Sequence, residues 1–373
     1  MKVITLIGTR PEIIKLSRVL AKLDAAVEHL IVHTGQNYDY ELNKIFFDDL
    51  GIRKPDYFLD AASSGAIETI ANVLNKVDEV LEIEKPDALL LLGDTNSGLG
   101  VIAAKKRKIP IFHMEAGNRC FDQRVPEEVN RKVIDHLADI NMPYSSIARE
   151  YLLREGLSPD QVIKTGSPMF EVLSFYSKNI ENSNVLNTLN AGPGKYFVLS
   201  AHREENVDQP EKLIALSAIL HQLCELYQFP IFFSLHPRTQ NRLNGLGLTL
   251  HPLVHVMKPL GFFDYIHLQK NAFCVISDSG TITEESSILG FPAINIRDAH
   301  ERPEGMEEGA VIMTGINSAV ILNSISYIRS LVDSGIQSKI ISDYDVANVS
   351  DKVVKIILSY THFIDRKIWS KNV

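Results

Sequence analysis

The sequence has few cysteines, little excess charge of either sign and no long hydrophobic run. Three cysteines, Cys120, Cys224 and Cys274, are too few and too scattered for a disulfide framework or a zinc site, which favours a reducing cytoplasm. The 38 basic against 46 acidic residues argue against a dedicated nucleic-acid binder, although local cations could still hold a small anion. No run approaches the ~20 apolar residues of a membrane span, and the first hydrophobic stretch is too short for a signal peptide. We therefore expect a cytoplasmic protein with neither nucleic-acid nor membrane partners.

Several common ligand-binding signatures are also missing. No GxGxxG follows the first apolar run, and no GxxxxGK[ST] motif occurs, which argues against a classical dinucleotide site and a P-loop. No spacing of histidine and carboxylate resembles HExxH or a carboxylate metal loop, so no metal site is predicted.

Short apolar runs that end in Gly, Asp, Ser or His alternate with helix-length stretches along the whole chain. Nearly continuous hydrophobic strands with polar residues after them are typical of a buried parallel sheet. The alternation predicts a doubly wound α/β fold, and 373 residues suffice for two Rossmann-like domains that face a cleft. The Asn-rich segment SFYSKNIENSNVLNTLNAGPGK interrupts the pattern, so the connection between domains is expected there or slightly before it. Ligands in such sheets bind beyond the carboxyl ends of the strands.

Two carboxylates stand at such strand ends in the first half, and a third stands at a helix start. Asp94 and Glu115 each follow an apolar strand, and Glu127 lies just after Pro126, which suits the first position of a helix. Close carboxyl groups raise one another's pKa and suit proton transfer. The structural alternative is that Glu127 and Arg131 form an i,i+4 pair and that Asp94 is a turn former.

Two strand-to-helix turns could bind an anion. In GTRPE, after the first strand, the amides of the helix start and Arg10 could hold a phosphate, or the segment is an ordinary turn with an exposed arginine. In SDSGT, Ser279 and Gly280 precede a helix, and Glu285 in its first turns either binds a ribose diol or complements the helix dipole. His202 and His236 end the first two strands of the second half. A lone histidine there is more often structural than catalytic.

These motifs in this order resemble the non-hydrolysing UDP-N-acetylglucosamine 2-epimerase family. The resemblance extends over nearly the whole chain and rests on GTRPE, GDT, HMEAGNR, PEEVNR, TGSPMFEVL, SAHREEN, SDSGTITEE and RDAHERPEG. It implies the glycosyltransferase-B architecture, in which a C-terminal helix returns to the first domain. The expected domains are then residues 1–168 with 355–373, and residues 169–354.

The resemblance also implies roles for individual residues. Asp94, Glu115 and Glu127 match the family's acid/base carboxylates, and His202 matches its catalytic histidine. The expected contacts to UDP come from Arg10, Arg131, His236, Ser279, Gly280, Thr281, Glu285 and Arg302. The implied reaction is the elimination and re-addition of UDP on a UDP-sugar, without cofactor or metal, in a homodimer. Thr281 departs from the family pattern, which has a second glycine there.

The stretch from HMEAGNR to LLREG looks closer to the UDP-N-acetyl-L-fucosamine synthase branch, which inverts C2 of UDP-2-acetamido-2,6-dideoxy-L-talose for surface polysaccharides. A 6-deoxy sugar needs an apolar contact at C6, which Phe121 and Val125 could provide. The alternatives are a UDP-N-acetylglucosamine/UDP-N-acetylmannosamine 2-epimerase and a retaining glycosyltransferase of the same fold. A hydrolysing 2-epimerase and a non-catalytic sugar-nucleotide sensor also remain possible.

Overall fold

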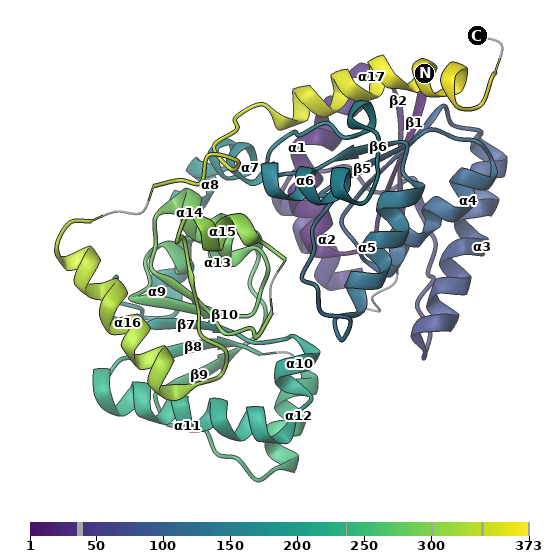
Figure 1. The fold of residues 1–373 in the computed structure, drawn as a ribbon. Coiled ribbons are helices and arrows are strands. Elements are labelled where there is room, and N and C mark those ends of the chain that lie inside the picture. The colour runs from purple at the N-terminus through teal and green to yellow at the C-terminus, as the bar shows by residue number, and fades with distance from the viewer. Residues whose placement is uncertain (36–39, 236, 300, 337–338, 372–373) are drawn as a thin grey trace. The chain divides into compact units, whose positions relative to one another are not determined.

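The computed structural model describes residues 1–35, 40–235, 237–299, 301–336 and 339–371. Contacts divide the chain into two compact units (Figure 1). Unit 1 comprises Met1–Phe175 with Ser342–Val373, and unit 2 comprises Tyr176–Ile341. None of the helices in the described ranges is both long enough and apolar enough to span a membrane.

Unit 1 is built on a parallel six-stranded sheet in the order β3-β2-β1-β4-β5-β6. The strand order reverses between β1 and β4, and this switch point is where doubly wound sheets bind ligands. The strands are β1 (Lys2–Ile7), β2 (Glu28–His33), β3 (Tyr57–Phe58), β4 (Ala88–Leu92), β5 (Ile111–Met114) and β6 (Ile140–Met142). The helices are α1 (Arg10–Ala26), α2 (Tyr40–Asp49), α3 (Ala66–Glu84), the 3₁₀ helix η1 (Asn96–Gly100), α4 (Val101–Lys106), α5 (Pro126–Leu137), α6 (Ser146–Arg154), the 3₁₀ helix η2 (Pro159–Gln161), α7 (Met169–Phe175) and α17 (Val349–Lys367).

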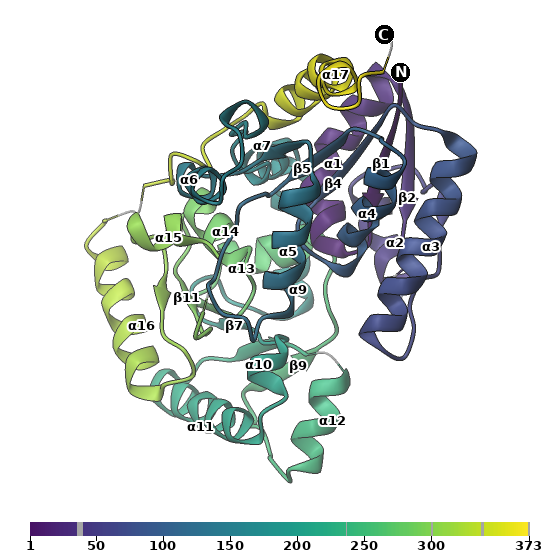
Figure 2. The ribbon, with the colours of Figure 1, turned by 45° about the vertical axis from the view of Figure 1, so that its right-hand side comes forward.

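Both faces of the unit 1 sheet are buried. Successive side chains of a strand point to opposite faces, and in β1 both sets are buried. Ile4 and Leu6 of β1 pack in one cluster with residues of α3, α4 and α5. Val3 and Ile7, which alternate with them, are fully buried as well. The helices α1 and α17 pack against each other, as the turned view in Figure 2 shows, and Lys22 pairs with Asp351 across them at 2.9 Å. The last long helix is thereby fixed to the first.

Unit 2 repeats this topology with a parallel sheet in the order β12-β11-β10-β7-β8-β9. Its switch point lies between β7 and β10. The strands are β7 (Phe197–Ser200), β8 (Ile231–Ser234), β9 (Val254–Met257), β10 (Cys274–Ser277), β11 (Ala293–Asn295) and β12 (Ile312–Met313). The helices are α8 (Ser177–Glu181), α9 (Val185–Thr188), α10 (Glu204–Val207), α11 (Pro210–Tyr227), α12 (Pro237–Gly245), α13 (Phe262–Lys270), α14 (Ile282–Leu289), α15 (Pro303–Glu307) and α16 (Ser318–Asp333).

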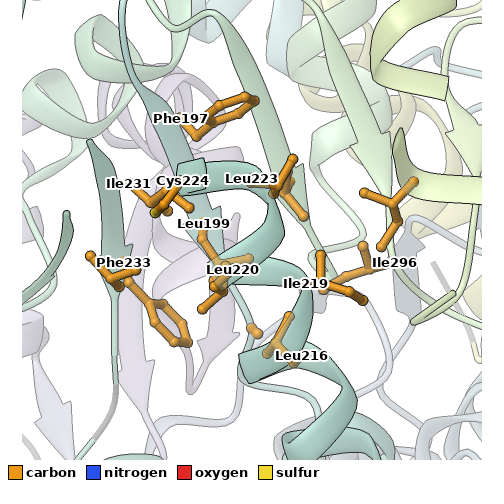
Figure 3. Close-up of a cluster of buried hydrophobic side chains, with 14 of the residues drawn as sticks. Phe197, Leu199, Leu216, Ile219, Leu220, Leu223, Cys224, Ile231, Phe233 and Ile296 are labelled. Atoms are coloured by element: carbon orange, nitrogen blue, oxygen red, sulfur yellow. The ribbon is translucent and has the colours of Figure 1, made fainter. Parts of the chain in front are cut away.

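The core of unit 2 shows why α11 lies on this sheet. Figure 3 shows side chains of α11 directed toward side chains of β7 and β8, including Phe197 and Phe233. The α11 residues recur every three or four positions and so share one face of the helix: Leu216, Ile219, Leu220 and Leu223. Two doubly wound parallel sheets confirm the predicted α/β fold class.

The division of the chain differs from the expected boundaries, which lay after residues 168 and 354. Contacts divide it after residues 175 and 341. Glu171 of α7 accepts the Ser350 N–H at 2.8 Å and the Ser350 hydroxyl at the start of α17. Asp343 accepts the Ser146 N–H at 3.0 Å and pairs with Lys164 at 2.6 Å. These contacts attach α7 and the segment before α17 to unit 1.

Candidate active site

The loops that follow β1, β2 and β4 meet closely at the switch point of unit 1. A Cβ atom at Gly8 would lie 1.9 Å from Ser97 Oγ and 2.6 Å from Thr34 Oγ1. These two hydroxyl groups are hydrogen-bonded to each other at 2.6 Å. A side chain at position 8 would therefore push the three loops apart, and glycine keeps them together.

Glu12 occupies the helix start that the sequence suggested for a phosphate. Its Oε2 accepts the N–H of Gly8 at 2.5 Å and that of Thr9 at 3.3 Å, and its Oε1 accepts the Thr95 hydroxyl at 2.8 Å. Burial raises the pKa of Glu12 to about 7, although these hydrogen bonds act in the opposite direction. The N–H groups of Gly8 and Thr9 are thus bound by the chain's own carboxyl group, which favours the alternative of an ordinary turn for these amides. Of that motif, Arg10 remains as the candidate phosphate contact.

Asp94 follows β4 and is held by Arg131 of α5. Arg131 donates from Nη2 and Nε to Asp94 Oδ2 at 2.6 and 2.9 Å, and from Nη1 to Glu128 at 2.8 Å. Asn130 donates to the Asp94 carbonyl at 3.1 Å. The Arg131 side chain is only 4% exposed, so its evident role in the structure is to orient Asp94. A contact from Arg131 to UDP stays a prediction.

Glu115 follows β5 and is paired with a lysine that the sequence analysis missed. Lys15 Nζ of α1 lies 2.6 Å from Glu115 Oε2, and both side chains are largely buried. The Lys15 ammonium also lies 5.6 Å from the centre of the Tyr144 ring. Glu115 has a φ of 62°, a left-handed conformation that costs a non-glycine residue about 1 kcal/mol. The sequence did contain a sign that Lys15 is buried. Lys15 stands four residues before Val19 and eight before Leu23, so it lies on the apolar face of α1.

The remaining predicted residues of unit 1 have different surroundings. Arg10 is half-buried, with its guanidinium carbon 5.8 Å from the centre of the Phe46 ring. Glu127 is half-buried in the first turn of α5. Phe121 is 71% exposed and packs edge-on against Tyr151 at 5.3 Å. Val125, in contrast, is buried as the residue that caps α5, so it cannot offer the surface contact suggested for it.

At the switch point of unit 2, the buried Asp278 organises the turn that carries His202. Asp278 accepts the N–H groups of His202 and Arg203 at 3.0 and 2.9 Å, and the side-chain amide of Asn206 at 3.2 Å. His202 Nδ1 lies 3.1 Å from Asp278 Oδ1, and the His202 side chain is half-exposed. The ring is therefore held through Nδ1 while Nε2 points away from Asp278. Asp278 stood within the SDSGT motif, but no role was predicted for it.

Ser279, Gly280 and Thr281 connect β10 to α14. Thr281 is the N-cap residue of α14, and its hydroxyl lies 3.0 Å from that of Ser279. A Cβ atom at Gly280 would lie 2.9 Å from Glu301 Oε1. A side chain at position 280 would therefore displace the Glu301 carboxylate. Thr281, at the position where the family pattern has a glycine, begins the helix as its N-cap residue.

The two glutamates of α14 are buried and have separate partners. Glu284 accepts from Arg302, with nitrogen–oxygen distances of 3.2 and 3.3 Å. Glu285 accepts the side-chain amide of Gln269 at 3.1 Å. Burial and the nearby charge of Glu285 raise the pKa of Tyr265. Neither glutamate is a solvent-exposed residue that merely complements the helix dipole.

His236 lies outside the described residues. Across the described ranges, no group of three or more His, Cys, Asp or Glu side chains is arranged to hold a metal ion.

Comparison with known proteins places the chain in a family. The model of the family described as UDP-N-acetylglucosamine 2-epimerase matches residues 21–358. The chain belongs to this family. A UDP-N-acetylglucosamine 2-epimerase of Methanocaldococcus jannaschii is 37% identical over 87% of this chain and 91% of its own. A Pseudomonas aeruginosa UDP-2,3-diacetamido-2,3-dideoxy-D-glucuronate 2-epimerase is 34% identical over 87% and 91%.

Solved structures of the family agree with this assignment. A UDP-N-acetylglucosamine 2-epimerase from Rickettsia bellii has a TM-score of 0.93 and 50% identity, with full coverage of both chains. The Methanocaldococcus jannaschii enzyme, solved with UDP-GlcNAc and UDP, has a TM-score of 0.89 and 34% identity over 96% of this chain and 100% of its own. The chain is thus a UDP-sugar 2-epimerase, an isomerase, which decides against the glycosyltransferase alternative. The sequence-based resemblance to the family is confirmed, whereas the L-fucosamine branch is not.

Proposed function

We propose that the chain interconverts the C2 epimers of a UDP-2-acetamido sugar by eliminating UDP and adding it back. The observation that carries this proposal is a pair of carboxylates at the ends of adjacent strands. Arg131 orients Asp94 after β4, and Lys15 orients Glu115 after β5. Inversion of a carbon requires proton removal on one face and delivery on the other, so two separate acid/base groups suit it. Glu127 is a third candidate.

Direct removal of the C2 proton would leave a carbanion with no adjacent carbonyl group to stabilise it. In elimination, a carboxylate takes the C2 proton and the C2–H electron pair becomes the C1=C2 double bond. The C1–O bond breaks at the same time, and its electron pair leaves with UDP. The products are a neutral 2-acetamidoglycal and UDP. Re-addition of UDP at C1, with a proton delivered to the other face of C2, gives the epimer.

The groups proposed to hold UDP are mostly in unit 2. A departing diphosphate gains negative charge, which cations and helix N-termini stabilise. His202, held by Asp278, can place a proton beside the diphosphate, and Ser279 and Gly280 supply the start of α14. Glu285 is proposed to accept the ribose hydroxyls. The other proposed UDP contacts are Arg10, Arg131, His236, Thr281 and Arg302.

Solvent exchange tests the reaction. The chain is incubated with a UDP-2-acetamido sugar in D₂O without any acceptor, and the products are followed by NMR. We expect deuterium at C2 of the epimer. The rate of its incorporation should be at least ~100-fold lower in Asp94→Asn and Glu115→Gln. Glu79→Gln, at an exposed carboxylate of α3, is the matched control and should exchange like the wild type. Full retention of protium at C2 would rule out elimination, and net release of free sugar would indicate hydrolysis instead.

For the substrate, we propose UDP-2-acetamido-2,6-dideoxy-L-talose, converted to UDP-N-acetyl-L-fucosamine for surface polysaccharides. Support comes from the exposed Phe121 ring, which offers an apolar surface to a C6 methyl group. Its loop is tied to the acid/base region, because the N–H groups of Cys120 and Phe121 donate to Glu128, the partner of Arg131. UDP-N-acetylglucosamine is the second candidate, favoured by the name of the Rickettsia bellii protein that is 50% identical.

Side-by-side kinetics distinguish the two substrates. We expect a higher kcat/KM for the 6-deoxy-L-talo substrate, and Phe121→Ser should lower that value about 10-fold while changing the value for UDP-N-acetylglucosamine less. A higher kcat/KM for UDP-N-acetylglucosamine would reject the L-fucosamine assignment and leave the 2-epimerase intact. We also propose that the chain forms a homodimer. Sedimentation equilibrium tests this, because it should give the mass of two chains.

A further inference from the structure

The buried histidine before Glu115 has an acceptor at each ring nitrogen. His113 Nε2 lies 2.8 Å from the carbonyl oxygen of Gly93, and Nδ1 lies 2.9 Å from Asp135 Oδ1 in an ion pair. A carbonyl oxygen only accepts, so Nε2 must carry a proton. A lone pair on Nδ1 would face a carboxylate oxygen at contact distance. An imidazolium, with a proton on each nitrogen, therefore suits both neighbours of the ring.

Asp135 is the buried carboxylate that pairs with the His113 ring. It is fully buried on α5 and accepts the Gly117 N–H with both oxygens at 3.2 Å and Arg119 Nη1 at 2.7 Å. Burial lowers the pKa of His113, but Asp135 and the Gly93 carbonyl outweigh it, so the pKa is raised. Glu155 in turn pairs with Arg119 at 2.7 Å.

The contacts of this pair adjoin both strand-end carboxylates. Gly93 precedes Asp94 and comes directly after Leu92, which forms the last pair of the β4–β5 ladder with Met114. Asp135 holds the N–H of Gly117, whose φ of 80° completes the left-handed turn that begins at Glu115. His113 lies in β5 opposite Leu91, and the His113–Asp135 pair thus connects the residue before Asp94 with the turn after Glu115.

We propose that His113, kept as an imidazolium by Asp135, is a positioning residue that holds Asp94 and Glu115 in their reactive arrangement. This inference rests on the proposed function of the two carboxylates. His113 is only 1% exposed, so it acts through its neighbours and not on the substrate. Misplacement of reacting groups by about 1 Å can cost ~100-fold in rate.

The test joins NMR with kinetics on the full chain. In ¹⁵N spectra of the histidine rings, His113 should show two protonated nitrogens at neutral pH, assigned by their loss in His113→Asn. In Asp135→Asn the ring should become neutral, with its proton on Nε2. Both variants should lower kcat about 10- to 100-fold with KM for the UDP-sugar within about twofold. His29→Asn is the matched control, because His29 is also buried beside an aspartate, Asp24, but at the opposite end of a strand.

Two results would overturn the inference. One is a neutral His113 ring in the wild-type chain, a measurement that does not depend on any variant folding. The other is a folded His113→Asn variant whose kcat falls no further than that of His29→Asn. Failure of the proposed function would appear differently, as a wild-type chain without epimerase activity.

Discussion

Glu12→Gln tests whether a buried carboxyl group makes the stability of unit 1 depend on pH. Glu12 is 3% exposed, and burial raises its pKa from 4.5 to about 7. A carboxyl group with a raised pKa binds its proton more tightly in the folded chain than in the unfolded chain. Its contribution to stability is therefore complete below pH 4.5 and is lost as the pH rises toward about 7.

The size of this effect follows from the shift. Each pKa unit corresponds to about 1.4 kcal/mol, so a rise from 4.5 to about 7 is worth about 3 kcal/mol. Glutamine has nearly the same shape, and its oxygen can still accept the N–H groups of Gly8 and Thr9. It cannot ionise. From acid to neutral pH, the wild type should therefore lose about 3 kcal/mol of unfolding free energy that the Glu12→Gln variant keeps.

Trp369 provides the assay, because it is the only tryptophan of the chain and lies in unit 1. Urea unfolding followed by its fluorescence, from about pH 4.5 to about pH 8, gives the two stability curves. Other titrating groups are common to both chains and cancel in the difference. Glu79→Gln, at an exposed position on α3, should run parallel to the wild type throughout. Parallel curves for Glu12→Gln would refute the reasoning, since they would mean that the hydrogen bonds to Glu12 fully offset its burial.

Three further predictions concern the pairs and turns of the site. Lys15→Met should destabilise unit 1 by about 3–5 kcal/mol, because it removes the ammonium group that pairs with the largely buried Glu115 carboxylate. Adding Glu115→Gln should restore much of the stability but no activity, as measured by urea unfolding and turnover. Gly117→Ala should cost more than Gly156→Ala in unfolding experiments, since both glycines have positive φ but only a Cβ atom at position 117 meets backbone, 2.4 Å from the Ala148 oxygen. Glu285→Ala should weaken UDP binding by about 1–3 kcal/mol in titration calorimetry, and unchanged affinity would remove Glu285 from the ribose site.

Much of the fold was predictable because its signals are local. Apolar runs such as ALLLL and IFHM are buried on both faces and end where the chain turns, so Asp94 and Glu115 could be placed at strand ends from sequence alone. Their adjacency follows from the parallel pairing of β4 and β5. The repeated strand–helix pattern likewise predicted two doubly wound sheets.

The partners of these residues were decided only by tertiary structure. Lys15 and Glu115 are 100 positions apart in the sequence, and only the tertiary fold brings the Lys15 side chain of α1 to the residue that follows β5. Arg131 reaches Asp94, 37 positions away, although the helical spacing suggested Glu127 as its partner. Glu12 fills the amides that resembled an anion site, and its neighbour Thr95 comes from a different strand end. An ionisable side chain is paired by whichever group the packing brings within about 3 Å, and spacing along one helix cannot specify that.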